Sequence, residues 1–310
     1  MKRTSLALFL FGIACFSVVG QVATPKNPNF VICEADRVVL YPSDVAVSMA
    51  DLKSPGNALE KLLDKVQADR TSEFMVVFAR PKSVKSYRMI RMMIAQRPVD
   101  VGYDVLDADE KPTWRPSLPK PEKGCIQAIP GPAGQARAVK AGCFRAMPHA
   151  VPSNKWAVFV ECRQNEVFFV DKENLDAQVE KLLASIPPDV RRGDLKGFMK
   201  AIRAQEIGNE SYTVNPNYLL TAIIAVEARP GVHGNAVDTL DKADGKFQKA
   251  LSQLKPDERF IAFMVRDDSF PAFRKARAEA EKLGFDTGWE LLGEGEPMKF
   301  GAGGSAISVQ

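Results

Sequence analysis

Three glutamates are the residues whose chemistry could serve catalysis. Glu34, Glu161 and Glu227 lie in strand-like apolar stretches, in the contexts "CEA", "VEC" and "VEA". A carboxylate buried in such a strand acquires a shifted pKa and can act as a general acid or base. On a strand with alternating sides, the same carboxylates can instead point to water, which is the interpretation that we favour. A hydrolase outside the cytoplasm that uses two of these carboxylates is therefore kept as the alternative.

Other catalytic chemistry lacks the residues that it needs. The chain contains no G-x-S-x-G, no P-loop, no G-x-G-x-x-G after a strand and no H-E-x-x-H. Its only histidines, His149 and His233, lie in loop-like sequence, and no C-x-x-C occurs, so we predict no metal site and no cofactor. The sequence therefore favours a protein that is not an enzyme.

Arg80 and Arg266 follow apolar stretches of strand length and are candidate binding residues. A guanidinium can grip a carboxylate or another anion through two parallel hydrogen bonds. Alternatively each arginine forms a structural ion pair, with Asp100 and Asp286, which lie beside the returning strand, as the candidate partners. We favour the structural role, because residues retained in two related segments more often preserve packing than a ligand.

Arg88 and Arg274 are also candidate binding residues, and each precedes a second arginine, Arg91 or Arg277, by three positions. At that spacing on a helix the two side chains share one face. The simplest interpretation is a solvated basic face, and the alternative is a site for an anionic polymer of the cell envelope.

Tyr103 and Trp289 are candidate stacking platforms for sugars. Each follows a glycine in a short strand-like stretch. Aromatic residues in such positions also cap the hydrophobic core, which is the interpretation that we favour.

These candidates recur because the chain repeats itself after 186 residues. Residues 74–106 align without a gap on residues 260–292, with eight identical pairs where about two are expected by chance. The identical pairs are Phe74/Phe260, Arg80/Arg266, Ser83/Ser269, Arg88/Arg274, Arg91/Arg277, Asp100/Asp286, Gly102/Gly288 and Leu106/Leu292. We interpret the repeat as an internal duplication.

The repeat predicts an α+β protein made of two related units. Continuous apolar stretches at 74–79 and 260–265 are typical of strands buried on both faces. An amphipathic helix follows each strand, with Ser83 or Ser269 as the expected N-cap, and a short strand closes each unit. Each unit thus has the order strand–strand–helix–strand–helix–strand.

Composition and turn residues set the expected boundaries. The first unit covers 30–109, a proline-rich linker covers 110–155, and the second unit covers 156–296 with an insertion at about 171–245. The insertion contains two helical patterns, at 175–186 and 195–207, and a strand pattern at 218–228. We expect residues 297–310 to be a disordered tail.

The N-terminus has the plan of a secretory signal, which predicts an exported protein, periplasmic or secreted. Lys2 and Arg3 precede an apolar stretch at 6–19, and cleavage is expected before Gln21, so that residues 1–20 are removed. The alternative is an uncleaved anchor in the inner membrane, and only then is the membrane a partner. The net charge of +4 falls to +2 without Lys2 and Arg3, too small a surplus for nucleic-acid binding.

Four cysteines remain after removal of the signal, in a compartment that favours disulfides. Cys125 and Cys143 flank one loop and are the first candidates for a bridge. Cys33 and Cys162 lie at matching points of the two units and either pair with each other or remain buried free thiols. A structural protein held rigid by disulfides is thus a further alternative.

The order of elements, carried by "FMVVFARPKSVKSYRMIRMMIAQRPVDVGYDVL" and its second copy, resembles the periplasmic domain of the ExbD/TolR biopolymer-transport family. That family pairs a membrane helix, whose acidic residue drives transport, with a small α+β periplasmic domain. This chain has no Asp or Glu in residues 1–31, so the resemblance implies only the periplasmic part. It implies a non-enzymatic envelope protein that binds a protein or polymer of the envelope as an accessory to transport.

Overall fold

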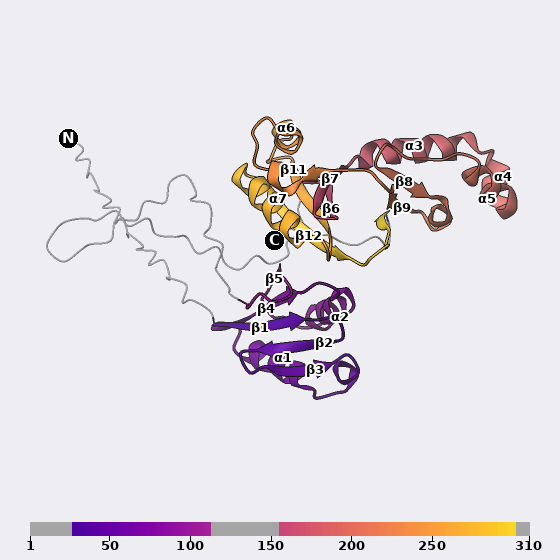
Figure 1. The fold of residues 1–310 in the computed structure, drawn as a ribbon. Helices are drawn as coiled ribbons and strands as arrows, with labels where there is room; N and C mark the ends of the chain where they lie inside the picture. Colours follow the sequence, from indigo (N-terminus) through magenta and orange to yellow (C-terminus); the bar gives the residue numbers. More distant parts are fainter. Residues whose placement is uncertain (1–26, 113–154, 302–310) are drawn as a thin grey trace, which may run out of the picture.

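The computed structural model describes residues 27–112 and 155–301, which form three sheets and their helices (Figure 1). The combination of helices with mixed sheets confirms the predicted α+β class. The predicted signal and most of the predicted linker lie outside the described residues. Within the described ranges, no helix has the length and apolar character needed to cross a membrane.

The first sheet combines a parallel core with an antiparallel edge. Its strand order is β3-β2-β1-β4-β5; β1 runs parallel to β4, β4 runs parallel to β5, and the β1–β2 and β2–β3 pairs are antiparallel. Its strands and helices are β1 (Asn27–Cys33), β2 (Arg37–Tyr41), β3 (Val45–Ser48), η1 (Asp51–Lys53), α1 (Ala58–Ala68), β4 (Glu73–Ala79), α2 (Val84–Ala95) and β5 (Val101–Val105).

Local sequence explains the helices of this unit. Helix α1 begins after Asn57, whose side chain accepts two backbone N–H groups of the first turn. In α2 the predicted stripe of Tyr87, Ile90 and Ile94 is buried. Ser83 occupies the expected N-cap position but makes no capping bond, and its buried hydroxyl has no hydrogen-bond partner among the described residues.

The second sheet has the same order and the same strand senses, β10-β7-β6-β11-β12. Cys33 lies opposite Ala79 in the first sheet, and Cys162 lies opposite Val265, the residue 186 positions later, in the second. The elements of this part are β6 (Trp156–Arg163), β7 (Glu166–Val170), β10 (Asn235–Ala236), η3 (Val237–Thr239), α6 (Lys246–Ser252), β11 (Arg259–Arg266), α7 (Phe270–Lys282) and β12 (Asp286–Leu292).

The helix-covered faces of the two sheets share one hydrophobic core. Residues of β1, β4 and α2 belong to the same buried cluster as residues of β6, β11 and α7. The contact includes an aromatic pair across the units, in which Tyr87 stacks on Trp289 with ring centroids 5.3 Å apart. The two units are therefore joined by buried apolar contacts as well as by chain connectivity.

The insertion forms a layer on the opposite face of the second sheet. Its buried residues cluster with Phe168, Val170, Met264 and Leu292 of that sheet. Because β10 takes the place that β3 has in the first sheet, the insertion ends before β10 rather than at 245. The elements of this layer are α3 (Lys172–Ser185), α4 (Pro188–Gly193), α5 (Leu195–Arg203), β8 (Tyr212–Asn215), η2 (Pro216–Thr221), β9 (Ile223–Ala228) and β13 (Met298–Gly301).

Two sequence predictions in this region are wrong in part. The strand expected from Tyr218 begins only at Ile223, because Pro216 starts a short 3-10 helix that ends at Ala222 with a positive φ of 55°. The tail expected to be disordered from 297 contains strand β13, which pairs with β9. Met298 and Phe300 are buried there, and burial of two large apolar side chains stabilises the strand. The residues beyond Gly301 lie outside the described ranges.

Neither described cysteine forms a disulfide. Cys33 of β1 and Cys162 of β6 are free and fully buried in separate sheets, so the pairing between them is wrong and the free-thiol alternative holds. Burial raises the pKa of both thiols, which keeps them protonated and unreactive at neutral pH. Cys125 and Cys143 lie outside the described residues.

Candidate functional site

A groove lies at the carboxyl ends of the parallel strands β1 and β4, on the face of the first sheet that faces away from its helices. Residues that follow these strands, Glu34 and Arg80, meet there because parallel strands end at the same edge. Open α/β sheets commonly bind ligands at this edge. The groove has a volume of about 530 Å³. Its lining residues are Ile32, Glu34, Arg37, Val39, Tyr41, Asp44, Ala46, Arg80, Lys111 and Pro112.

The floor of the groove continues an apolar cluster on the same face of the sheet. The buried members of this cluster come from β1, β4 and the residue after β5, and Phe30, Val39 and Tyr41 pack against them. Among the described residues, the cluster contains no side chain from another layer. We call this side of the first sheet the groove face. Its apolar floor and charged rim suit a ligand with an apolar body and a charged group.

Arg80 is the central cation of the groove, and its hydrogen-bonding capacity is only partly used. Its Nη1 donates to Glu34 Oε1 at 3.3 Å, and its Nη2 donates to the backbone oxygen of Glu110 at 2.9 Å. Its Nε is buried and has no hydrogen-bond partner among the described residues. A buried N–H without a partner is unfavourable, and an added acceptor would remove that penalty.

The charge around Arg80 is not balanced. Glu34 is shared between Arg80 and Arg37, whose Nε donates to Glu34 Oε2 at 2.7 Å. The groove also contains Lys111 and Asp44, so three cations face two carboxylates. The surplus positive charge favours an anionic ligand.

The equivalent position in the second unit is closed. Arg266 donates from Nε to Glu161 Oε1 at 2.8 Å and from its two Nη atoms to the backbone oxygens of Gly293 and Glu296. Glu161 is 0% exposed, whereas Glu34 is 22% exposed. All three guanidinium nitrogens of Arg266 are thus bonded within the chain, which indicates a structural role.

The insertion completes the closed site. Tyr212 of β8 donates a hydrogen bond from its hydroxyl to Glu161 Oε2 at 3.0 Å. Arg163 lies 3.1 Å from the same oxygen and places its guanidinium 3.9 Å from the ring centre of Phe168. Burial, followed by the charge of Glu161, raises the pKa of Tyr212, so this hydroxyl acts as a permanent donor. We call this side of the second sheet the covered face.

The predicted aspartate partners of the two arginines are wrong. Arg80 pairs with Glu34, directly after β1, and Arg266 pairs with Glu161 of β6, rather than with Asp100 and Asp286. The first strand of each unit lies beside the central strand, and its carboxylate reaches the arginine directly. Asp286 pairs instead with Lys155, at the opposite end of the strand.

Arg88 and Arg274 do not form a solvated basic face, because both bind the other unit. Arg88 donates to the backbone oxygen of Leu291 and to Glu296, and Arg274 donates to the backbone oxygen of Val105 and to Glu110. The two contacts are equivalent, because Arg274 lies 186 residues after Arg88, and Leu291 and Glu296 lie 186 residues after Val105 and Glu110. These arginines latch α2 to the end of β12 and α7 to the end of β5.

Arg91 and Arg277 extend the latch with the same symmetry. Arg91 pairs with Glu290, and Arg277 lies 3.8 Å from Asp104, the residue 186 positions before Glu290. All four helix arginines are therefore used within the chain and are not available for an envelope polymer.

Tyr103 and Trp289 are core aromatics at the contact between the units. Trp289 is 3% exposed and packs between Tyr87 and Phe273, and Tyr103 packs edge-on against Tyr87. Burial raises the pKa of Tyr103 to about 12. The favoured core interpretation fits these positions, and a stacked sugar would have to displace the other unit.

The three candidate catalytic glutamates do not share a cleft. Glu34 lines the groove of the first sheet, Glu161 is sealed on the covered face, and Glu227 of β9 accepts from Asn215. Glu227 lies opposite Thr213, so it points to the other side of the small sheet from Tyr212, the partner of Glu161. The pair of carboxylates that the hydrolase alternative requires is thus not assembled from these residues.

The rim of the groove was missed by sequence reasoning. Arg37, Val39 and Tyr41 alternate along β2, and this spacing of two residues was a signal that they share one face. Lys111 gave no local signal, because it reaches the groove from a loop after β5. In the described ranges, no cluster of three or more His, Cys, Asp or Glu side chains could hold a metal ion.

Comparisons with family models, with curated proteins and with solved structures find no match to this chain.

Proposed function

We propose that this chain is a non-enzymatic, exported binding protein of the cell envelope, and that its groove takes the carboxylate of an envelope component. The buried Nε of Arg80, which has no hydrogen-bond partner among the described residues, is the observation that carries the proposal. A carboxylate beside it would accept the missing hydrogen bond and neutralise the surplus charge of the rim. The apolar residues of the floor would receive the body of the ligand.

The contrast between the two units supports a binding role for the first. Arg266, the counterpart of Arg80, has all its nitrogens engaged, and its partner Glu161 is buried under Tyr212 of the insertion. The matched strand orders support a duplication in which one copy became a covered scaffold. The resemblance to the ExbD/TolR periplasmic domain supports the same placement, since that domain contacts partners in the envelope.

A titration with a small carboxylate tests the site directly. The probe is 4-phenylbutyrate, which joins a carboxylate to an apolar body, and 4-phenylbutyramide is its uncharged counterpart. Binding is followed by nuclear magnetic resonance of the full chain. We expect the acid to bind in the groove, and the amide to bind at least about tenfold more weakly, because a hydrogen bond to a charged group is lost.

Two variants locate the binding. Arg80→Met should weaken binding of the acid about tenfold or more. The control is Arg259→Met, which also removes a strand arginine paired with a glutamate, but on the second sheet, away from the groove. Equal affinity for acid and amide, or no effect of Arg80→Met, would refute the assignment of the groove.

The intact mass of the native protein tests the expected export. Soluble and membrane fractions of the producing cells are compared. A soluble species that begins at Gln21 fits a diffusing exported binder, whereas a full-length species in the membrane fraction fits the anchored alternative. A full-length species in the cytosol would contradict both.

A further inference from the structure

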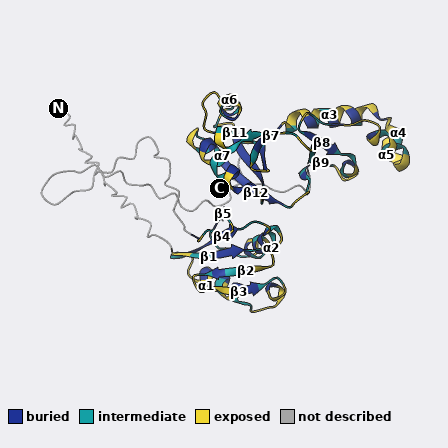
Figure 2. Cartoon of the chain, viewed as in Figure 1, coloured by how far each residue is buried: buried dark blue, intermediate teal, exposed yellow. Residues whose placement is uncertain are grey.

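The tip of the insertion combines unpaired positive charge with exposed apolar side chains. Figure 1 shows that α3 extends away from the second sheet and that α4 and α5 lie at the far end of this arm. Figure 2 shows much of the outer surface of α4 and α5 as exposed. We define the insertion tip as α4, α5 and η2, which packs against α5.

The charges of the tip are mostly basic and mostly free. Helices α4 and α5 with the linking Asp194 contain five basic and two acidic residues, a net charge of +3. Four of the basic residues make no ion pair or side-chain hydrogen bond with another described residue: Arg191, Arg192, Lys196 and Lys200. The fifth, Arg203, donates to Asn217 of η2. Most of these cations are thus available to an external partner.

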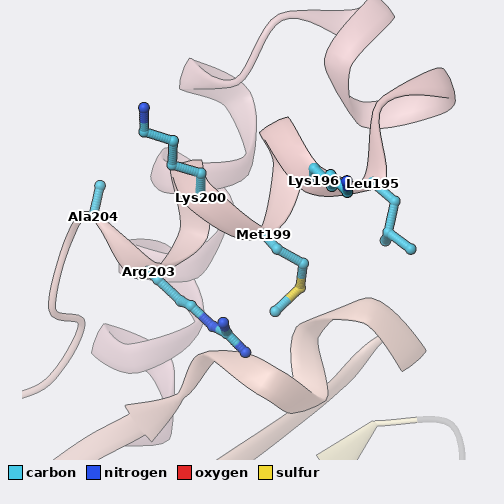
Figure 3. A pocket seen from close by; sticks show the side chains of 6 residues that line it. All are labelled: Leu195, Lys196, Met199, Lys200, Arg203 and Ala204. Carbon is cyan, nitrogen blue, oxygen red and sulfur yellow. The ribbon is translucent and has the colours of Figure 1, made fainter.

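Exposed apolar side chains stand beside these cations. Leu195 is 65% exposed and Leu220 of η2 is 44% exposed. A shallow hollow of about 670 Å³ follows α5 and is lined by Leu195, Met199 and the stems of basic residues. Figure 3 shows Leu195 and Met199 on the side of α5 that faces the neighbouring short helix, with Lys200 pointing to the other side.

This combination matches the requirements of an interface between water and lipid. The apolar face of α5 packs largely on the chain's own core through Ile202, so only exposed side chains such as Leu195 are left for lipid. Exposed apolar side chains beside basic residues can insert between headgroups while the cations bind the lipid phosphates. Basic side chains gain from anionic headgroups, and leucine side chains gain from the acyl boundary. A protruding tip can reach a flat surface without obstruction from the two sheets.

We propose that the insertion tip docks on the surface of an anionic phospholipid bilayer. The free cations of α4 and α5 contact the lipid phosphates, and Leu195 and Leu220 enter the headgroup region. The proposed docking involves none of the groove residues, so its test is independent of the test of the carboxylate site.

Sedimentation with vesicles tests the docking. The full chain is mixed with phosphatidylcholine vesicles that contain or lack phosphatidylglycerol, and the bound fraction is measured at low and at high salt. We expect binding only to the anionic vesicles and a loss of binding at high salt. The test variant is Arg192→Glu/Lys196→Glu/Lys200→Glu, which reverses three free charges of the tip.

A matched control separates the tip from the total charge of the protein. Lys242→Glu/Lys246→Glu/Lys249→Glu makes the same change in net charge at exposed positions around the start of α6. The tip variant should bind anionic vesicles at least about a hundredfold more weakly, since each basic residue contributes a factor of about five near such a surface. The control variant should bind nearly as well as the parent chain.

The apolar contribution has its own variant. Leu195→Ser removes an exposed side chain and should weaken vesicle binding several-fold without changing its salt dependence. Equal losses in the tip and control variants would overturn the proposal, as would undiminished binding of the tip variant through the N-terminal segment. Tip-dependent binding to poly-glutamate with none to anionic vesicles would also overturn it, and would point to an acidic protein.

Discussion

The groove face of the first sheet and the covered face of the second sheet start from the same arrangement and reach opposite results. In both, an arginine at the end of the central strand pairs with a glutamate at the end of the neighbouring strand, although Glu34 follows Cys33 whereas Glu161 precedes Cys162. On the covered face, the insertion adds Tyr212 and excludes water from Glu161. On the groove face, Glu34 and Arg80 stay partly exposed and line a groove.

The surroundings of the arginine–glutamate pair, rather than the pair itself, therefore set its role. An exposed ion pair is weak and leaves its members able to exchange partners. A buried pair is costly to form, because both charges lose their hydration. It is also costly to break, because the remaining charge is left in the core with neither a partner nor water. The same two residue types can therefore serve binding in one unit and structure in the other.

Removal of the glutamate from each pair should give the largest difference between the two faces. Glu161→Ala leaves Arg163 and Arg266 buried beside each other and should lower the free energy of unfolding by about 3–5 kcal/mol. Glu34→Ala removes a partly exposed partner and should cost about 0–1 kcal/mol. Urea denaturation of the two variants and the parent chain measures both values.

Glu161→Gln serves as a second variant if Glu161→Ala does not fold. It keeps the side-chain volume and an acceptor for Tyr212, so its loss should fall between those of the two alanine variants. Similar losses for Glu34→Ala and Glu161→Ala would show that the faces do not differ as the structure implies.

Removal of the Tyr212 hydroxyl, which the insertion supplies, should cause a smaller but measurable loss of stability. Tyr212→Phe removes the hydrogen bond to Glu161 and should cost about 1.5–3 kcal/mol, the usual contribution of a bond to a charged group. The control is Tyr41→Phe on the groove face, whose hydroxyl makes no hydrogen bond with another described residue, and its expected cost is near zero. Thermal unfolding followed by circular dichroism distinguishes the two, and a reversed order would contradict the contrast.

Much of the fold was predictable because local hydrophobic patterns in the sequence indicate its strands and helices. The strands at 74–79 and 260–265 are continuous apolar stretches, and the helices after them have a clear apolar stripe. The short strands β3, β8, β10 and β13 were missed, since two to four residues carry too little periodicity. In β13, the alternation of Met298 and Phe300 was overshadowed by the glycine-rich residues that follow.

The site was less predictable because its contacts are long-range. The sequence pointed to Arg80 as a candidate binding residue, but its partner Glu34 lies 46 residues earlier and was considered only for catalysis. The latch arginines Arg88 and Arg274 were assigned to solvent, because nothing in a single helix shows that another unit packs on it. The identity of these residues across the repeat was the available signal, and it preserved a contact between the units.

The smallest predicted effect concerns the latch and its dependence on pH. Burial opposes the charge on Glu296, yet the hydrogen bonds from Arg88 and from the N–H of Gly293 hold its pKa below the ordinary 4.5. A carboxyl whose pKa is lower in the folded state stabilises the fold above its unfolded pKa. That contribution disappears as the pH falls through the folded value.

Glu296→Gln should therefore lower stability at neutral pH by up to about 1 kcal/mol and reduce the loss of stability on acidification below pH 4.5. Urea denaturation of parent and variant across this acidic range measures the difference between the two curves. The counterpart Glu110→Gln acts on a side chain that is 40% exposed instead of 26%, so it should cost less at neutral pH. Parallel pH curves for the parent chain and Glu296→Gln would mean that Arg88 holds the second unit through the backbone oxygen of Leu291 alone. In that case packing around Tyr87 and Trp289 would hold the two units together, and the ion pairs would only determine which residues of the units face each other.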